Sequence, residues 1–548
     1  MMRTFALSTA FCNTMQLLTL LTLLLFAERS SSEGVKLPAK PLSILAFLPT
    51  EGKSHFMGFK PLLESLVSRG HNVTLVAPFA LDGAKRPYRH VKVEQTLGDF
   101  DMLKVAKYVN LIPTPLHLWW FGPHISETSL DKPSVANFIR SDRSSFDLVL
   151  FENFYHECFV AIGHKYGAPL VQLLPFSANS RVSQWHSNPY NPAYIPDLTS
   201  RFGSNMTFAQ RTSNAVSAFF YTAVSRLVYL PRQRAVADKH FVYPGHERRP
   251  DLVDMLRNVS LTLVNSHPII GTAVPMVPSY VHVAGMHCVP AGPLPEDLKQ
   301  IVESAKEGIV YFSLGSVVKS SKMPKETVSL LLSELSKIEQ TVLWKWEADD
   351  VPQLPKNVIV RKWFPQNDIL GHKNCKLFIT HGGVQSTTES IYHGVPMLAI
   401  PVFGDQQGNS LRAQYRGINN YTDYYNNYTI FRNQSIILFY SPFIRHRRYR
   451  ENARKTSAVF RDNPLPPLEK AVFWVEYVAR HSGAKHLRTA ANDLYWFQYM
   501  LLDVLLLVSF VVVLMAWTTK KMLGCVFGRC CRRSRNITSP PTVGKKTQ

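Results

Sequence analysis

Short apolar runs alternate with helix-like patterns along most of the chain. Residues 42–48 form one such run, a loop follows at residues 51–58, and apolar residues then recur at positions 62, 63, 66 and 67. Gly70 ends this pattern, and residues 73–77 form the next apolar run. Apolar runs of this length are typical of buried parallel strands, and the spacing between them is typical of an amphipathic helix. The order predicts a βαβ unit.

The second half of the chain repeats this order. A strand, an amphipathic helix and another strand are predicted at residues 308–314, 328–338 and 341–346. Further strands are predicted at residues 146–151, 169–174, 358–361, 377–379 and 397–400. A stretch that contains Pro and Gly separates the two series at residues 288–296. We therefore predict an α/β fold of two Rossmann-like βαβ domains facing a cleft, at residues 34–290 and 291–480.

Two apolar stretches lie outside this pattern, one near each end. The first, at residues 17–27, is too short to cross a bilayer and precedes a polar stretch, which is typical of a signal peptide, so residues 1–33 are set apart from the fold. The second, at residues 499–517, approaches the ~20 residues that a membrane-spanning helix needs. Eight Lys or Arg residues and no acidic residue follow it.

The charge distribution sets the expected topology, because positive residues collect on the cytosolic side of a span. We expect a single-pass type I membrane protein with a membrane-proximal segment at 481–498, a transmembrane helix at 499–518 and a cytosolic tail at 519–548. Both βα domains then lie in the lumen. The tail supplies eight of the net charge of +22, which suits anionic lipid headgroups. No basic patch interleaved with aromatic residues favours nucleic acid as a partner.

Cysteine usage argues against a disulfide framework. Of seven cysteines, only Cys158, Cys288 and Cys375 fall in the predicted lumenal domains, and they are isolated from one another. No tight group of ligand residues predicts a metal. Asn205 and Asn258 begin Asn-x-Ser/Thr sequons and are expected glycan sites, whereas Asn72 opens a predicted buried strand and is expected to be a poor one.

The densest chemical signal lies at residues 363–409. A predicted strand leads into His381, Gly382 and Gly383, and a helix is predicted from about Ser386. Free backbone N–H groups at the positive end of a helix dipole form an anion site, which a diphosphate fits. Glycines let phosphates approach the main chain, and His381 and Ser386 add side-chain donors.

Other residues of this stretch follow neighbouring strands. Trp363 offers a flat face to a base, and Gln366 offers a donor and an acceptor to the edge of that base. Glu389 can accept hydrogen bonds from ribose hydroxyls, while Asp405 and Gln406 can bind the hydroxyls of a sugar. Each residue alone is more often part of a turn or a core. Together they converge on the carboxyl ends of successive strands, which predicts one site.

The stretch WFPQNDILGH…FITHGGVQSTTESIYHGVPMLAIPVFGDQ, at residues 363–406, resembles the signature of the UDP-glycosyltransferase superfamily. Similar stretches are GKSHFMGFKPLLESLVSRGHNVTLVAP near the front, VYFSLGS at 310–316 and AVFWVEYVARHSGAKHLR before the apolar run, so the resemblance covers nearly the whole chain. It is to the animal membrane-bound branch, and FENFYHECF looks arthropod-like. The resemblance implies a GT-B fold with a UDP-sugar donor in the C-terminal domain and an acceptor in the N-terminal domain.

The same resemblance implies roles for single residues. The matching positions are Trp363 and Gln366 for uracil, Glu389 for ribose, His381, Gly383 and Ser386 with nearby Ser316 for the diphosphate, and Asp405 and Gln406 for the sugar. Lys545 and Lys546 resemble the dilysine retrieval signal of this branch, which implies residence in the endoplasmic reticulum membrane.

Transfer to an acceptor hydroxyl needs a base for its proton and a stabilised leaving group. His55 follows the first predicted strand, and imidazole suits a base near neutral pH. Family matching puts its carboxylate partner at Glu152, where most members have Asp, and Asp147 is the alternative, although it precedes the strand. The resemblance implies inversion at the anomeric carbon without a metal. Asp99 and Asp101 spell the Asp-x-Asp of metal-dependent transferases but lack a flanking strand, so they are interpreted as loop or helix start.

We therefore expect transfer of a hexosyl group from UDP-glucose or UDP-glucuronate to a hydroxyl of a small lipophilic acceptor, with no further cofactor. A catalytically silent nucleotide-sugar-binding protein is the alternative, and a homo-oligomer stays open. A nicotinamide-dependent enzyme is disfavoured because no G-x-G-x-x-G follows the first strand. Residues 418–448 depart from the family pattern. Aromatic residues that either line an acceptor pocket or pack in the core are Trp119, Trp120, Phe121, Trp185, Tyr190 and Tyr194.

Overall fold

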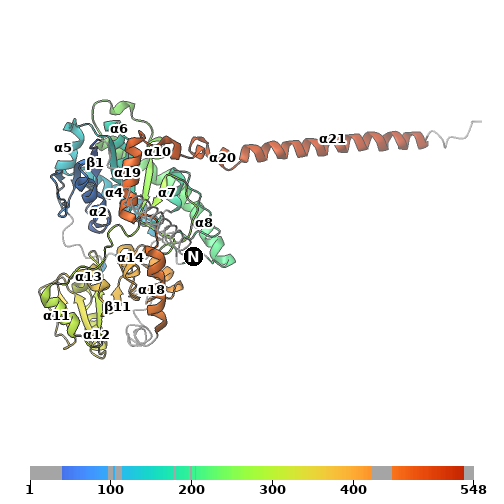
Figure 1. The fold of residues 1–548 in the computed structure, drawn as a ribbon. Coiled ribbons are helices and arrows are strands. Elements are labelled where there is room, and N and C mark those ends of the chain that lie inside the picture. Colours follow the sequence, from blue (N-terminus) through green and yellow to red (C-terminus); the bar gives the residue numbers. More distant parts are fainter. Residues whose placement is uncertain are drawn as a thin grey trace, which may run out of the picture.

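Two parallel β-sheets organise the chain in the computed structural model, which describes residues 40–96, 103, 104, 106, 114–177, 179–197, 200, 202, 203, 205–421 and 447–535. Figure 1 shows the two α/β bodies one above the other, with a long helix extending away from them. The expected signal peptide, the Asp99 and Asp101 pair, most of the atypical segment 418–448 and the C-terminal lysine pair lie outside the described residues.

The first sheet has seven strands in the order β3-β2-β1-β4-β5-β6-β7, all parallel. Its strands are β1 (Ser43–Phe47), β2 (Asn72–Ala77), β3 (Arg89–Lys92), β4 (Leu148–Glu152), β5 (Leu170–Leu174), β6 (Leu261–Val264) and β7 (Tyr280–His282). Leu45 and Phe47 of β1 join the core on one face, and Ile44 and Ala46 join the core on the other. Burial on both faces explains why these strands are continuous apolar runs in the sequence.

The helices of this first domain cover both faces of the sheet. They are α2 (Lys53–Ser68), α4 (Thr114–Leu130), α5 (Pro133–Ser141), η1 (Glu157–Val160), α6 (Ala161–Tyr166), α7 (Ser180–Trp185), α8 (Phe208–Val224), the π-helical η2 (Ser225–Tyr229), α9 (Leu230–His240), η3 (His246–Arg248) and α10 (Leu252–Arg257). α2 follows β1 directly, so the start of α2 lies at the carboxyl edge of the sheet.

The second sheet has six parallel strands in the order β10-β9-β8-β11-β12-β13. Its strands are β8 (Ile309–Ser313), β9 (Thr341–Lys345), β10 (Val358–Arg361), β11 (Cys375–Thr380), β12 (Met397–Ala399) and β13 (Asn419–Tyr421). Its helices are α11 (Glu296–Ser304), η4 (Ser320–Lys322), α12 (Lys325–Leu335), α13 (Gln366–Gly371), α14 (Val384–His393), α15 (Gln406–Tyr415) and α18 (Arg447–Arg461). Two parallel α/β domains were expected, and the structure has them.

The last helix before the membrane-proximal segment returns to the first domain. α19 (Pro467–Arg480) packs on α2, and its Val472 and Val475 belong to the same core cluster as Ile44 of β1. Glu476 of α19 is buried and accepts hydrogen bonds from Arg69 at 2.8 Å and His71 at 3.2 Å. The expected C-terminal domain ran from 291 to 480, and within that range α19 packs on the first sheet.

A short, kinked segment connects α19 to the long apolar helix. It contains η5 (Lys485–Leu487), η6 (Ala490–Asp493) and α20 (Trp496–Tyr499), and α21 (Leu502–Arg535) follows. Leu501 has a φ of 54°, which interrupts the helix between α20 and α21, so α21 begins three residues later than expected. Residues 502–527 are long and apolar enough to cross a membrane, and none of their most apolar stretch is buried against the protein.

The sequons differ in part from expectation. Asn72 is exposed at the first position of β2, and burial begins only at Val73, so strand burial does not hide its side chain. Asn205 and Asn258 are also exposed, as a glycan site requires. Cys158, Cys288 and Cys375 are all free thiols.

Candidate active site between the two domains

A histidine and a carboxylate meet at the carboxyl edge of the first sheet. His55 lies in the first turn of α2, and Glu152 is the last residue of β4, which pairs with β1. His55 Nδ1 lies 2.7 Å from Glu152 Oε1, and the Thr50 hydroxyl donates to Glu152 Oε2 at 2.8 Å. Since a carboxylate only accepts, Nδ1–H of His55 donates and Nε2 keeps its lone pair for a substrate proton.

Electrostatics keep Glu152 ionised although it is buried. Burial raises the pKa of Glu152, but the charge and hydrogen bond of His55, with smaller contributions from His156 and Thr50, bring the pKa below its usual value. Burial lowers the pKa of His156 to about 4, so this neighbour stays neutral. The alternative partner Asp147 accepts from Ser43 N–H at 2.8 Å, at the amino end of β1 and away from His55.

Two phenylalanines flank His55 and were not predicted. The rings of Phe154 and Phe176 contact the imidazole edge-on, with centroids 4.8 and 5.1 Å away. Each follows a strand end by two residues, after β4 and β5 respectively. Their position just after a predicted strand was the feature of the sequence that could have identified them as site residues. The two rings give the histidine an apolar surround.

The expected anion site has the backbone geometry that it needs. Gly382 has a φ of 79°, and Gly383 caps α14, whose first turn has free N–H groups. A Cβ on Gly383 would lie 2.5 Å from His381 Nε2, and one on Gly315 would lie 2.6 Å from His381 Cε1. The imidazole therefore fits because both neighbours are glycine. Burial and the nearby Lys345 lower the pKa of His381 to about 4, so the neutral ring can donate through one nitrogen.

The residues expected to bind the nucleoside lie together. Trp363 is 64% exposed, which leaves its ring free to stack on a base. The Gln366 amide donates to Glu389 and lies 3.4 Å from the Ser386 hydroxyl. Burial raises the pKa of Glu389 to about 7. Because Gln366 and Glu389 bind each other, a nucleoside would have to compete with this contact for their polar atoms.

Two lysines near Trp363 were missed. Lys345 at the end of β9 and Lys53 at the start of α2 have their Nζ atoms 5.4 and 5.9 Å from the Trp363 ring centroid. Lys345 also donates to the Gly315 carbonyl at 2.6 Å, and burial lowers its pKa. A lone lysine at a strand end carries no spacing signal in the sequence. The two ammonium groups give this edge a positive field, which suits a diphosphate.

The three remaining predicted residues are positioned differently from one another. Asp405 accepts from Asn409 at 2.6 Å, and burial raises its pKa. Gln406 Oε1 is occupied by the N–H groups of Val402 and Phe403 at 2.7 and 3.0 Å. The side-chain carbonyl of Gln406 therefore binds the loop before α15, and its NH₂ group is the part left to bind a sugar. Ser316 is exposed in the loop after β8.

Direct contacts join the two domains beside the site. The Gln385 amide in the first turn of α14 donates to the Ser54 carbonyl, next to His55. Arg416, after α15, donates to the carbonyls of Pro268 and Gly271 at 3.0 and 2.8 Å. The first contact brings the diphosphate end of α14 and the dyad to the same place.

Among the described residues, one cluster of acidic and histidine side chains has the spacing to hold a metal ion. Glu127, Asp131 and His240 form the one such group, and Lys239 Nζ lies 2.6 Å from Glu127 Oε1. None of them belongs to the predicted site.

The aromatic residues expected either to line an acceptor pocket or to pack in the core fall into two groups. Trp119 and Trp185 are buried in the core, while Trp120 is 69% exposed. Phe121 and Tyr194 are exposed as well, and Tyr190 is half-buried.

Known proteins resemble this chain over most of its length. The family model for UDP-glucoronosyl and UDP-glucosyl transferase matches residues 133–536. UDP-glucosyltransferase 2 of Dactylopius coccus is 35% identical over 90% of this chain and 93% of that protein. UDP-glucuronosyltransferase 2B7 of Homo sapiens is 32% identical over 88% and 94% respectively.

Solved structures agree on the fold. A UDP-glucosyltransferase from Polygonum tinctorium, capable of glucosylating indoxyl, aligns with a TM-score of 0.53 at 15% identity, over 81% of this chain and 99% of that one. The two-domain arrangement is that of GT-B glycosyltransferases. With its family match, its relatives and its paired α/β domains, the chain belongs to the UDP-glycosyltransferase family and transfers a hexosyl group from a UDP-sugar to an acceptor.

Proposed function

We propose that His55 is the general base of this transfer and that Glu152 orients and stabilises it. The single observation that carries the proposal is the 2.7 Å contact between His55 Nδ1 and Glu152 Oε1 at the carboxyl edge of the sheet. With Nδ1 bound, Nε2 takes the proton of an acceptor hydroxyl, and ionised Glu152 stabilises the imidazolium that forms. Phe154 and Phe176 favour a lipophilic acceptor beside this nitrogen.

The donor binds on the opposite domain in this proposal. Trp363 stacks on uracil, Gln366 binds its edge, Glu389 accepts from ribose, and the start of α14 with His381, Ser386 and Ser316 binds the diphosphate. Asp405 and the Gln406 amide bind the hexose. The acceptor oxygen attacks the anomeric carbon while the bond to the UDP oxygen breaks, and UDP leaves with the electron pair. Attack opposite the leaving group inverts the configuration, and N–H groups with Lys345 stabilise the departing charge without a metal.

The proposed location follows from the two ends of the chain. α21 crosses the endoplasmic reticulum membrane, the basic tail lies in the cytosol, and both domains lie in the lumen. The donor is UDP-glucose or UDP-glucuronate, and the acceptor is a small lipophilic alcohol or phenol. A donor panel against one phenolic acceptor, with products detected by mass, decides between the two sugars.

The His55→Ala variant tests the base. We expect it to lose transfer by two to four orders of magnitude, about the usual contribution of a general base, while UDP binding stays intact on the other domain. His124→Ala, which removes an exposed histidine of α4, is the matched control and keeps full activity. Full activity of His55→Ala would remove His55 from the mechanism. A wild-type protein that binds UDP-sugar but releases no UDP with any acceptor would favour the catalytically silent alternative.

A further inference from the structure

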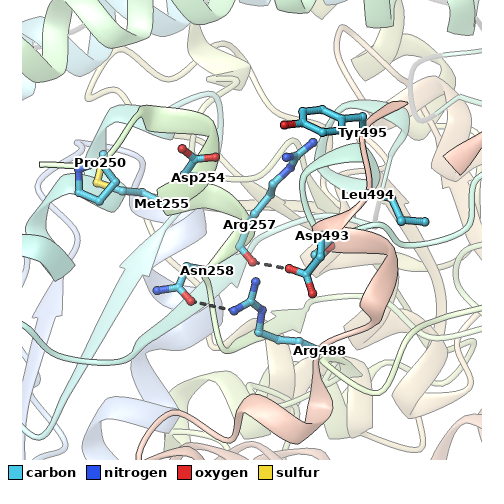
Figure 2. Close-up of a pocket in the computed structure, with 10 residues that line it drawn as sticks. Pro250, Asp254, Met255, Arg257, Asn258, Arg488, Asp493, Leu494 and Tyr495 are labelled. Carbon is cyan, nitrogen blue, oxygen red and sulfur yellow. Dashed lines mark hydrogen bonds between the residues drawn. The ribbon is translucent and has the colours of Figure 1, made fainter. Parts of the chain in front are cut away.

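A pocket lined by charged and apolar side chains lies just before the long apolar helix, away from the candidate active site. It has a volume of about 540 Å³ and is bounded by the end of α10 and by the segment between α19 and α20. Figure 2 shows side chains of opposite charge around it, contributed by Asp254, Arg257, Arg488 and Asp493. This volume falls within the ~300–1,000 Å³ of ligand sites.

Two polar groups in the wall of this pocket have unmet hydrogen-bonding capacity. Asn492 is 6% exposed, and its Nδ2 group donates to the Arg257 carbonyl at 3.4 Å, but its Oδ1 atom has no partner among the described residues. Arg488 donates through one terminal nitrogen to Asn258 Oδ1 at 3.0 Å, and its Nε–H likewise has no partner in the described part of the chain. A buried acceptor and a buried donor without partners are costly unless a ligand binds them.

The pocket lies where a bilayer would present its headgroups. Tyr495 is part of its wall, and the next residues lead through α20 into the candidate span at Leu502. Tyr495, Trp496 and Tyr499 are all exposed by about half or more, at 68%, 60% and 48%. Aromatic residues that flank a span sit at headgroup level. A lipid headgroup can therefore enter the pocket while its acyl chains stay beside α21.

We propose that this pocket binds the headgroup of a zwitterionic phospholipid with a primary amine, of the phosphatidylethanolamine type. The proposal rests on α21 crossing a membrane. The guanidinium groups of Arg257 and Arg488 bind the phosphate, with Arg488 Nε–H as the open donor. Asp254 and Asp493 balance the ammonium charge, and Asn492 Oδ1 accepts one of its N–H bonds.

The balance of charge and the open acceptor select this headgroup over others. An anionic lipid without an amine would leave both carboxylates facing a phosphate. A choline headgroup carries the same charges but has no N–H to donate, so Asn492 Oδ1 would stay without a partner. Loss of one hydrogen bond to a charged group corresponds to roughly tenfold in affinity. We therefore expect about a tenfold preference for ethanolamine over choline headgroups.

Native mass spectrometry of the full chain tests this preference. The protein is released from mixed micelles that contain equal amounts of phosphatidylethanolamine, phosphatidylcholine and phosphatidylglycerol, and the retained lipids are counted. We expect one ethanolamine lipid to be retained about tenfold more than either competitor. An added excess of inorganic phosphate leaves that lipid in place if a whole headgroup is bound, and displaces it if the pocket is only a phosphate site.

Variants connect the preference to the pocket. Asn492→Leu is expected to reduce the ethanolamine-to-choline ratio to about one, and Arg488→Gln to lower retention of both lipids about tenfold. Lys485→Gln, an exposed cation of the same segment, leaves the ratio unchanged. Hexosyl transfer, which in the proposed mechanism needs both domains, checks that each variant is folded. Equal retention of the three lipids by the wild type, displacement by phosphate, or an unchanged ratio in Asn492→Leu would overturn the proposal.

Discussion

At the scale of single residues, Glu152 contacts His55 although its side chain is one methylene longer than the aspartate that the family resemblance implies. It does so because both of its oxygens are held, one by His55 and the other by Thr50. One additional methylene therefore leaves the dyad geometry intact. The proposed base needs that carboxylate to be ionised, which the lowered pKa of Glu152 favours.

Glu152→Gln should keep the shape of this contact and remove its charge. Without the carboxylate the imidazolium is not stabilised, and His55 is free to adopt the wrong tautomer. We expect kcat to fall by about 10³ to 10⁴, with the KM for the UDP-sugar nearly unchanged, as steady-state rates of product formation would report. Glu152→Asp serves as the charge-preserving control and should retain more activity than the amide. Equal rates for the amide and the wild type would separate Glu152 from catalysis.

The raised pKa of Glu389 predicts a pH dependence of donor binding. The pKa of the Glu389 carboxyl is 4.5 in the unfolded chain and about 7 in the native protein, so the stability of the native protein falls as pH rises between these values in the absence of ligand. Ribose hydroxyls favour the charged acceptor. We expect the affinity for UDP-glucose, measured by calorimetry without an acceptor, to weaken by up to about tenfold per pH unit below 7.

Glu389→Gln provides the control for that measurement. Its affinity should be lower and should vary little between pH 6 and 8, since an amide does not titrate in this range. The diphosphate of a UDP-sugar is a diester and keeps its charge there, so it does not obscure the effect. A wild-type affinity that is constant with pH would show that Glu389 does not bind ribose as a carboxylate.

At the scale of elements, α19 packs with the first domain, although the whole second domain lies between them in the sequence. Its apolar face packs on α2 and the first sheet, while Glu476 binds Arg69 and His71. His71 Nδ1 accepts from Leu42 N–H at 3.1 Å, so its proton is on Nε2, which donates to Glu476. Burial is the main reason that the pKa of His71 is lowered, and it keeps this histidine neutral.

Val475→Ala tests the packing of α19. Removing two buried methyl groups should lower the free energy of unfolding by about 2 kcal/mol. Hydrogen exchange should accelerate in α2 and β1 and not in β11, because α19 packs on the first sheet. Val459→Ala, at a 56% exposed position of α18, is the matched control and should change neither. Faster hydrogen exchange confined to β11 would show that α19 packs on the second sheet instead of the first.

The sequence predicted where strands and helices occur better than it predicted which elements pack against one another. β1, β8 and β11 were found because strands buried on both faces are continuous apolar runs. The apolar face of α19 is equally clear, but periodicity does not say which sheet covers a face. In the site, the His381–Gly383 turn carries a spacing signal and was found. The inward turn of Gln406 and the approach of Lys53 to Trp363 depend on tertiary packing and left no such signal.

At the scale of the whole molecule, two features expose apolar surface to the surroundings. One is the candidate span in α21. The other is a group of exposed apolar side chains along α8 and η2, where Phe208, Phe219 and Leu227 are 77%, 78% and 76% exposed. An exposed apolar face of this kind marks an interaction surface.

Two truncations separate folding from membrane attachment. A chain ending after Tyr495 should fold, bind UDP-sugar and remain in the supernatant when membranes are sedimented, because α19 is kept and α21 is lost. A chain ending after Pro466 should lose the cover of the first sheet and aggregate. If the chain ending after Tyr495 still sediments with membranes, α21 is not the main anchor, and the α8 side chains become the surface to mutate next.

The return of α19 also determines which half of the enzyme moves. The connection to α21 leaves from the first domain, and the backbone passes from one domain to the other between β7 and α11 and between α18 and α19. We propose that α21 anchors the first domain, so that any change in the distance between the domains moves the second domain relative to the membrane. In this arrangement the proposed base lies on the anchored domain, which an acceptor dissolved in the bilayer would approach first, and the proposed donor site lies on the other domain.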